Sequence, residues 1–197
     1  LLISYFVNVK GNCPAEWAND KIKTFLDLNY RVILLTGFQS EIKSNKFLKV
    51  LKIPSLSYIC FSEEFKNFKF KGNWLYSIYS LIPKTIGRFL DFILIKLNGT
   101  VSAGYWSWVI SSSPILFFYL INKKFNFIFS TGGPTACHLI GCFIASIFRK
   151  PLYCEFQDPL VGNCINKKLS VSAAKFLEKI IVNISHRTIF VTKFATS

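Results

Sequence analysis

Several residues that could bind or activate a ligand follow apolar, strand-like segments of this sequence. Thr131, Gly132 and Gly133 come directly after one such segment, and Glu155 and Asp158 lie at the end of the next. Glycines at the end of a strand let a ligand approach the backbone closely, and a carboxylate can orient a hydroxyl group. This arrangement predicts a site for a sugar or a phosphate group. Two turn glycines and an aspartate that caps the following turn are the structural alternative.

Two further candidates lie in or beside expected helices. His138 falls one turn into an apolar helix, where a histidine either forms a hydrogen bond in the core or faces a site. Gly11 lies in the loop after the first apolar segment, where amides at the start of a helix can receive a phosphate. Gly11 is equally suited to a plain turn, so both residues have a structural and a functional interpretation.

Alternating strands and helices are expected to position these residues. Strands are predicted over Leu1–Val7, Arg31–Thr36, Ser55–Phe61, Phe127–Ser130, Leu152–Phe156 and Thr188–Thr192. One helix is expected to begin at Pro14 and one or two to lie within Trp74–Lys96. The other helices are predicted over Trp106–Ile121, Ala136–Phe148 and Leu169–Ile184. This alternation predicts an α/β fold, with a Rossmann-like, mostly parallel sheet and helices on both faces. Such sheets bind ligands at the carboxyl ends of their strands, so Gly11, Gly132, His138 and Asp158 are expected to face one cleft there.

The charge of the chain predicts an anionic partner. It has 24 basic and 10 acidic residues and a net charge of +14. Basic and aromatic residues interleave between Lys43 and Lys96, as they do in nucleic-acid-binding proteins. The same segment is rich in leucine and isoleucine and has no nucleic-acid motif, so contact with an anionic membrane through residues 61–123 is favoured and no nucleic acid is expected. A solvated lysine-rich face with ordinary core aromatics explains the composition equally well.

The uncharged stretch Leu97–Asn122 is long enough to span a membrane. Its serines, glycines and Pro114 lower its hydrophobicity, which favours a buried or interfacial helix instead. The protein is therefore expected to be cytoplasmic, peripheral at the inner face of the cell membrane. The six cysteines are irregularly spaced in apolar surroundings, so they are interpreted as structural thiols and no metal site is expected.

Four motifs occur in a characteristic order along the chain. They are Tyr105-Trp106-Ser107-Trp108, Ser130-Thr131-Gly132-Gly133-Pro134, His138, and Glu155-Phe156-Gln157-Asp158-Pro159-Leu160. In order and spacing they resemble the amino-terminal domain of GT-B-fold, family 4-like glycosyltransferases that extend bacterial surface polysaccharides. The chain departs from the pattern at Gly133, Gln157 and Leu160, where the family has proline, arginine and tryptophan.

The resemblance implies transfer of a sugar from a nucleotide diphosphate donor to a glycan or lipid-linked glycan acceptor, with retention and without a metal or other cofactor. It implies catalytic roles for His138 and Asp158, and donor or acceptor binding by Gly11, Thr131, Gly132, Gly133 and Glu155. Residues 1–197 would form the acceptor-side domain. The donor-binding domain is expected after Ser197, so this chain alone is expected to be inactive.

Two other classes of function remain open from the residues themselves. A non-catalytic, membrane-surface binding module could keep this fold and lose the active site. A Rossmann oxidoreductase is disfavoured, because the loop around Gly11 lacks the Gly-x-Gly-x-x-Gly fingerprint of dinucleotide binding.

Overall fold

The computed structural model describes residues 1–37, 42–53, 55, 85–86, 89, 92–93, 106–132, 134–157 and 168–191. The strands are β1 (Leu2–Ile3), β2 (Val32–Thr36), β3 (Leu48–Lys52), β4 (Ile128–Thr131), β5 (Leu152–Phe156) and β6 (Arg187–Phe190), and the helices are α1 (Cys13–Asp27), α4 (Trp106–Leu120), α5 (Thr135–Phe148) and α6 (Lys168–Ile184). The predicted helices within residues 74–96 lie almost entirely outside the described residues, as do Gly133 and Asp158.

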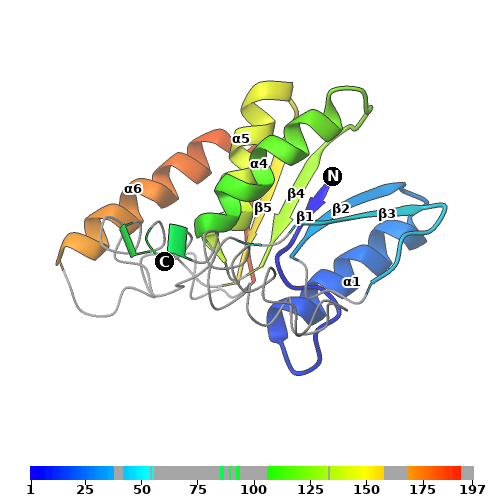
Figure 1. Cartoon of the computed structure of the whole chain (residues 1–197), viewed down its shortest axis with the longest axis horizontal. Helices are drawn as coiled ribbons and strands as arrows, with labels where there is room; N and C mark the ends of the chain where they lie inside the picture. The colour runs from blue at the N-terminus through cyan, green and yellow to red at the C-terminus, as the bar shows by residue number, and fades with distance from the viewer. Residues whose placement is uncertain are drawn as a thin grey trace.

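The strands form one six-stranded sheet in the order β3-β2-β1-β4-β5-β6 (Figure 1). Every neighbouring pair is parallel. In the centre, Leu2 of β1 lies between Leu34 of β2 and Phe129 of β4. The chain thus has the predicted α/β fold, with a Rossmann-like parallel sheet and alternating helices.

Successive residues of each strand pack on opposite faces of the sheet, as the pleat requires. On the face covered by α1, Leu2, Leu34 and Phe129 pack against Ala18 and Ile22 of the helix. On the other face, the core includes Ile3, Tyr5, Leu35, Trp108, Leu116, Ile128, Ile140, Ile144, Cys154 and Phe156. Helix α5 contacts the central strands there, and α4 and α6 pack beside it (Figure 1). The two faces therefore offer separate environments to side chains at the carboxyl edge.

Local sequence signals account for the ends of α1 and α5. The side chain of Asn12 accepts a hydrogen bond from Ala15 N at 3.0 Å and caps α1, and Pro14 fits its first turn. At α5, Pro134 occupies the N-cap rather than the predicted first helical position. The helix ends at Arg149, whose backbone is left-handed with φ 51°.

The sheet differs from the predicted one at two strands. The third strand is Leu48–Lys52, which the sequence did not predict, and the predicted strand at 55–61 lies outside the described residues apart from Ser55. Lysines interrupt the apolar pattern of β3, as is typical of edge strands. Strand β1 is shorter than predicted and ends at Ile3.

Helix α4 lies where the sequence predicts a buried or interfacial helix, and it buries one face, which includes Trp108, Leu116 and Leu120, while Ile115 and Phe118 are exposed. Trp108 is fully buried, donates from Nε1 to Ile53 O at 2.8 Å, and meets the Tyr5 ring edge-on at 4.8 Å between centroids. No helix in the described part of the chain is long and apolar enough to cross a membrane. Tyr5 and Trp108 thus attach α4 to the carboxyl half of the sheet.

Candidate functional site at the carboxyl edge of the sheet

The sheet changes its direction of winding between β1 and β4. These strands are neighbours, but the chain proceeds from β1 to β2 on one side and from β4 to β5 on the other. The loops that follow β1 and β4 separate at such a point and leave a crevice, in which open α/β sheets bind their ligands. Gly11 and Gly132 follow these two strands, so the fold brings both glycines to the edge predicted for the site.

Gly132 follows β4 directly and has φ 129°, a conformation that residues with a Cβ rarely adopt. A Cβ there would lie 3.6 Å from Ser4 Oγ and 3.7 Å from Cys137 Sγ, which are ordinary contacts. Glycine is therefore required by the backbone conformation more than by lack of space. Gly11 has φ 72° and nothing within 4 Å of an added Cβ, as in an open loop.

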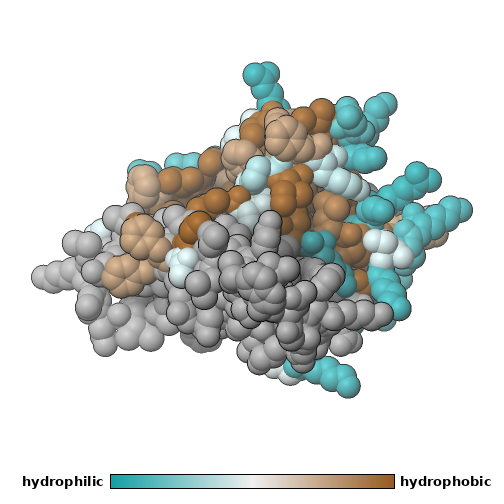
Figure 2. All heavy atoms as spheres, in the orientation of Figure 1, coloured by the Kyte–Doolittle hydropathy of each residue, from teal (hydrophilic) through white to brown (hydrophobic). Residues whose placement is uncertain are grey.

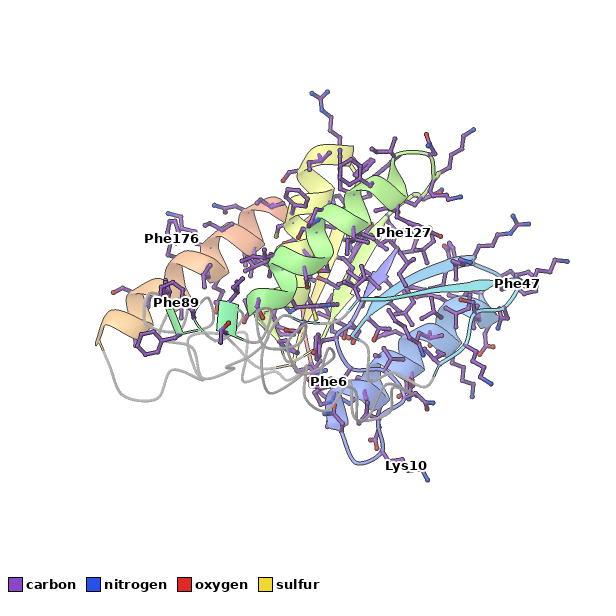
Figure 3. The ribbon with its side chains drawn as sticks, viewed as in Figure 1. Phe6, Lys10, Phe47, Phe89, Phe127 and Phe176 are labelled. Atoms are coloured by element: carbon purple, nitrogen blue, oxygen red, sulfur yellow. The ribbon has the colours of Figure 1, made fainter. Side chains whose placement is uncertain are left out.

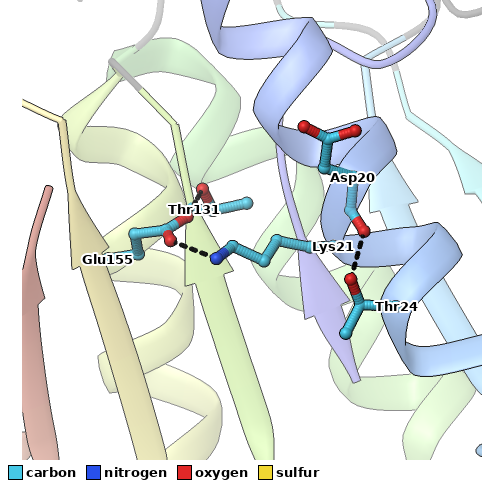
Figure 4. A network of polar contacts seen from close by, with 5 residues as sticks. All are labelled: Asp20, Lys21, Thr24, Thr131 and Glu155. Carbon is cyan, nitrogen blue, oxygen red and sulfur yellow. Dashed lines mark hydrogen bonds and ion pairs between the residues drawn. The ribbon is translucent and has the colours of Figure 1, made fainter. Parts of the chain in front are cut away.

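Glu155 lies at the centre of a polar network on the α1 face of the sheet (Figure 4). Its side chain is buried; Oε2 accepts a hydrogen bond from Thr131 Oγ1 at 2.5 Å, and Oε1 lies 2.6 Å from Lys21 Nζ. The Lys21 ammonium also lies 5.8 Å from the centre of the Phe129 ring. A buried carboxylate needs such partners, because removing its charge from water is costly. The network joins α1 to β4 and β5 directly beneath the glycine turn.

Lys21 is a residue of this site that the sequence analysis missed. The available signal was Glu155 itself, since a carboxylate inside an apolar strand demands a cationic partner. The position of that partner depends on how α1 lies across the sheet, which the local pattern does not specify.

His138 lies on the opposite face, inside the core next to α5. Its side chain is 1% exposed, Nδ1 lies 2.9 Å from Ser130 Oγ, and its ring centre is 4.4 Å from that of Phe156. Burial disfavours the charged imidazolium and lowers the pKa of His138 to about 4, so the ring is neutral at pH 7. The structure therefore separates His138 from Thr131 and Glu155 by the thickness of the sheet, and it corresponds to the hydrogen-bonded core interpretation of this histidine.

Gln157 follows β5 at the carboxyl edge. Its side chain is 8% exposed, and Nε2 has no hydrogen-bond partner among the described residues. A buried amide without a partner is costly in a folded protein, so its N–H groups are available to a ligand oxygen. The roles predicted for its neighbour Asp158 and for Gly133 remain predictions, because both residues lie outside the described part of the chain.

The buried cysteines are thiols rather than thiolates. Burial raises the pKa of Cys137 and of Cys142 to about 12 and that of Cys154 to about 11. In the part of the chain that the structure describes, no group of three or more His, Cys, Asp and Glu side chains could hold a metal ion. These cysteines fill the core beside α5, as their apolar surroundings in the sequence indicate.

The strand order, with its change of winding between β1 and β4, defines the class of this chain as a Rossmann-like α/β domain, in which the candidate ligand site lies at the carboxyl edge. No protein-family model matches the sequence, and no curated protein matches it either.

Proposed function

We propose that this chain is the acceptor-side domain of a GT-B-type glycosyltransferase resembling family 4, which transfers a sugar from a nucleotide diphosphate donor to a glycan or lipid-linked glycan. The observation that carries the proposal is the position of the Ser130–Pro134 motif. Thr131 and Gly132 end the strand beside the winding change, where a ligand of this fold class is expected. A motif shared by chance would have no reason to fall at that point.

The described residues would bind and orient the acceptor. The Gly132 turn lets a sugar hydroxyl approach the backbone, and Gln157 Nε2, which has no partner among the described residues, offers N–H donors at the end of the adjacent strand. Glu155, neutralised by Lys21, keeps the floor of the site rigid. His138 lies in the core and acts in this proposal as a positioning residue through Ser130. Rate acceleration would come from positioning, and from cationic and amide groups that stabilise the leaving diphosphate.

Acceptor binding provides the test, because it requires no donor-binding domain. The chain is titrated with a panel of soluble and bacterial lipid-linked glycans whose sugars are uncharged, and the best ligand is compared for the wild type, Gly132→Val and Asn29→Val. Asn29 has a positive φ of 61° and lies in the turn after α1, so valine there introduces similar backbone strain at the far edge of the sheet. We expect Gly132→Val to weaken binding by about tenfold or more, equivalent to about 1.4 kcal/mol, and Asn29→Val to leave it unchanged.

Absence of binding to every member of the panel, or equal affinity of the wild type and Gly132→Val, would refute the proposal. Residues 1–197 are also incubated with labelled nucleotide sugars. Binding without turnover is expected, because the groups that fix and neutralise the diphosphate are expected on a separate domain.

A non-catalytic membrane-surface module is the second candidate. Exposed apolar side chains on α4, including Ile115 at 53% and Phe118 at 70% exposure, lie shortly before Lys123 and Lys124. Apolar and cationic groups together favour anionic lipid surfaces. Salt-sensitive sedimentation with anionic but not neutral vesicles, without binding of any glycan, would favour this function. Of the predicted membrane segment 61–123, residues 61–105 lie almost entirely outside the described residues.

A further inference from the structure

A cationic pocket lies at the amino ends of the strands, on the edge opposite the candidate site. Its volume is about 550 Å³, and it is lined by Phe25 of α1, by Tyr119 of α4 and by residues that precede or begin β1 to β4. Five of the lining side chains are cationic: Arg31, Lys46, Lys49, Lys123 and Lys124. Figure 3 shows Phe127 and Phe47 toward this end of the sheet, away from Phe6 and Lys10. In Figure 2, hydrophilic side chains extend from the same end.

These cations lack acidic partners. No aspartate or glutamate is among the described residues that line the pocket, and none of the five cations forms an ion pair within the described part of the chain. Instead, Lys46 Nζ lies 5.7 Å from the Phe47 ring centre, and Lys123 Nζ lies 5.8 Å from that of Tyr119. Neighbouring like charges repel each other, and an anionic ligand would relieve that repulsion.

A favourable interaction with helix dipoles does not explain why all five cationic side chains line this pocket. Lys123 and Lys124 follow the end of α4, where cations are favourable. Lys46 and Lys49, in contrast, precede or lie within β3 and follow no described helix. The cations therefore surround the pocket for a reason other than helix capping.

The spacing of the charges favours an extended ligand. Lys49 belongs to β3 and Lys124 precedes β4, and these strands are three positions apart in the sheet. At about 4.8 Å per strand, the two groups of cations are separated by about 14 Å. Helix α1 ends at this edge with its carbonyl groups, so no amino-terminal amides of α1 are available to hold a compact phosphate. A nucleotide, which concentrates its charge at one end, would leave one group of cations unpaired.

Aromatic rings form the wall between the charges. Tyr30 and Phe47 are 47% and 50% exposed, and the Phe127 ring lies 5.6 Å from that of Tyr30 and 5.8 Å from that of Phe25. Such rings pack well against the apolar C–H face of a sugar. We propose that this pocket binds an acidic oligosaccharide, whose negative groups pair with the cations on both sides and whose rings lie on the aromatic wall. The choice of a sugar rests on the proposed function, whereas the charge pattern does not.

Binding of defined oligosaccharides tests the proposal. Trigalacturonate is the acidic probe and maltotriose the neutral control, each titrated calorimetrically into the chain at low and at high salt. The double variant Lys123→Gln/Lys124→Gln removes one group of cations. Its control is Lys175→Gln/Lys179→Gln, which removes the same charge from exposed positions of α6. Circular dichroism establishes that each variant is folded.

We expect trigalacturonate to bind at least about tenfold more tightly than maltotriose, and to lose about tenfold or more in affinity in the Lys123/Lys124 variant and at high salt. The α6 variant should change the affinity by less than about twofold, or about 0.4 kcal/mol. Tyr30→Ala should weaken binding without changing its salt dependence.

Three results would overturn the proposal: no binding of trigalacturonate, equal losses in both double variants, or tighter binding of UDP than of trigalacturonate in this pocket. The Lys123→Gln/Lys124→Gln variant should leave the affinity for an acceptor whose binding depends on Gly132 unchanged, since these lysines lie at the other edge of the sheet. A failure of this pocket is thus distinguishable from a failure of the carboxyl-edge site.

Discussion

The buried, neutral imidazole of His138 makes the stability of this domain depend on pH. In the unfolded chain the histidine pKa is 6.5, and burial lowers it to about 4 in the folded protein. Because the folded pKa is the lower of the two, the unfolded state takes up more protons as the pH falls. The contribution of His138 is therefore fully present above about pH 7 and is lost progressively between about pH 6.5 and pH 4.

The size of the effect follows from the two pKa values. From pH 7.5 to pH 5, preferential protonation of the unfolded state lowers the free energy of unfolding by about 2 kcal/mol. Well below pH 4 this decrease reaches its limit of about 3 kcal/mol. A loss of this size is a large fraction of the stability of a typical domain. It should be visible as a lower urea midpoint at pH 5.

Urea unfolding of the wild type and of His138→Gln, followed by circular dichroism at several pH values, measures the effect. Glutamine can still bond Ser130 Oγ but does not titrate, so other acid-sensitive groups contribute equally to both proteins. The wild type should lose about 2 kcal/mol more than the variant between pH 7.5 and pH 5. Parallel pH profiles of the two proteins would show that His138 is protonated in the folded state, which is incompatible with its burial beside Phe156.

Three further substitutions or modifications test the described contacts. Lys21→Met should destabilise the domain by about 1–3 kcal/mol in thermal or urea unfolding, because it removes the cationic partner of the buried Glu155 carboxylate. The double variant Lys21→Met/Glu155→Gln should recover most of this loss. Additive losses of stability from the two substitutions would contradict the ion pair. Trp108→Phe should lower the free energy of unfolding by about 2 kcal/mol, since it removes the 2.8 Å hydrogen bond to Ile53 O and leaves a small void. A decrease below about 0.5 kcal/mol would show that this hydrogen bond contributes little to stability. Among the four described cysteines, only the exposed Cys13 should react with iodoacetamide in the native protein. The buried cysteines, Cys137, Cys142 and Cys154, should react only after unfolding, as mass spectrometry of tryptic peptides would show. Labelling of Cys137 in the native protein would contradict its burial.

The helices and central strands were predictable because their signals are local. The strand Leu152–Phe156 and the helix ending at Phe148 follow from mostly apolar runs on either side of Lys150 and Pro151. Strand β3 was missed because it lies at the sheet edge, where only Leu48 is buried and two lysines interrupt the apolar residues. This segment is a strand because it pairs with β2, and such pairing cannot be read from the local sequence pattern.

The candidate site was predictable in its position but not in its composition. Gly132 and Thr131 follow a clear strand, so their place at the carboxyl edge could be inferred. The side chains of Ser130 and Thr131 are adjacent in sequence but lie on opposite faces of the sheet. Ser130 therefore contacts His138 in the core, whereas Thr131 contacts Glu155 beneath α1. A one-residue difference in where the strand ends decides which side chains meet. Residue type and spacing alone do not determine that difference.

The brevity of β1 has a mechanical consequence for the carboxyl edge of the sheet. Only Leu2 and Ile3 pair with each neighbouring strand, whereas β2 and β3 pair over five residues and β4 and β5 over four. Backbone bonds outside β1, from Ser4 N to Leu35 O and from Gly37 N to Tyr5 O, both at 3.0 Å, continue the connection to β2, so the narrowest border of the sheet is the one between β1 and β4. Side chains cross this border on both faces, through Lys21 to Glu155 and through Tyr5 to Trp108. Removing either contact would leave backbone pairing as the main connection across this border, and the position of Gly132 relative to the loop that contains Gly11 would then be fixed less strictly.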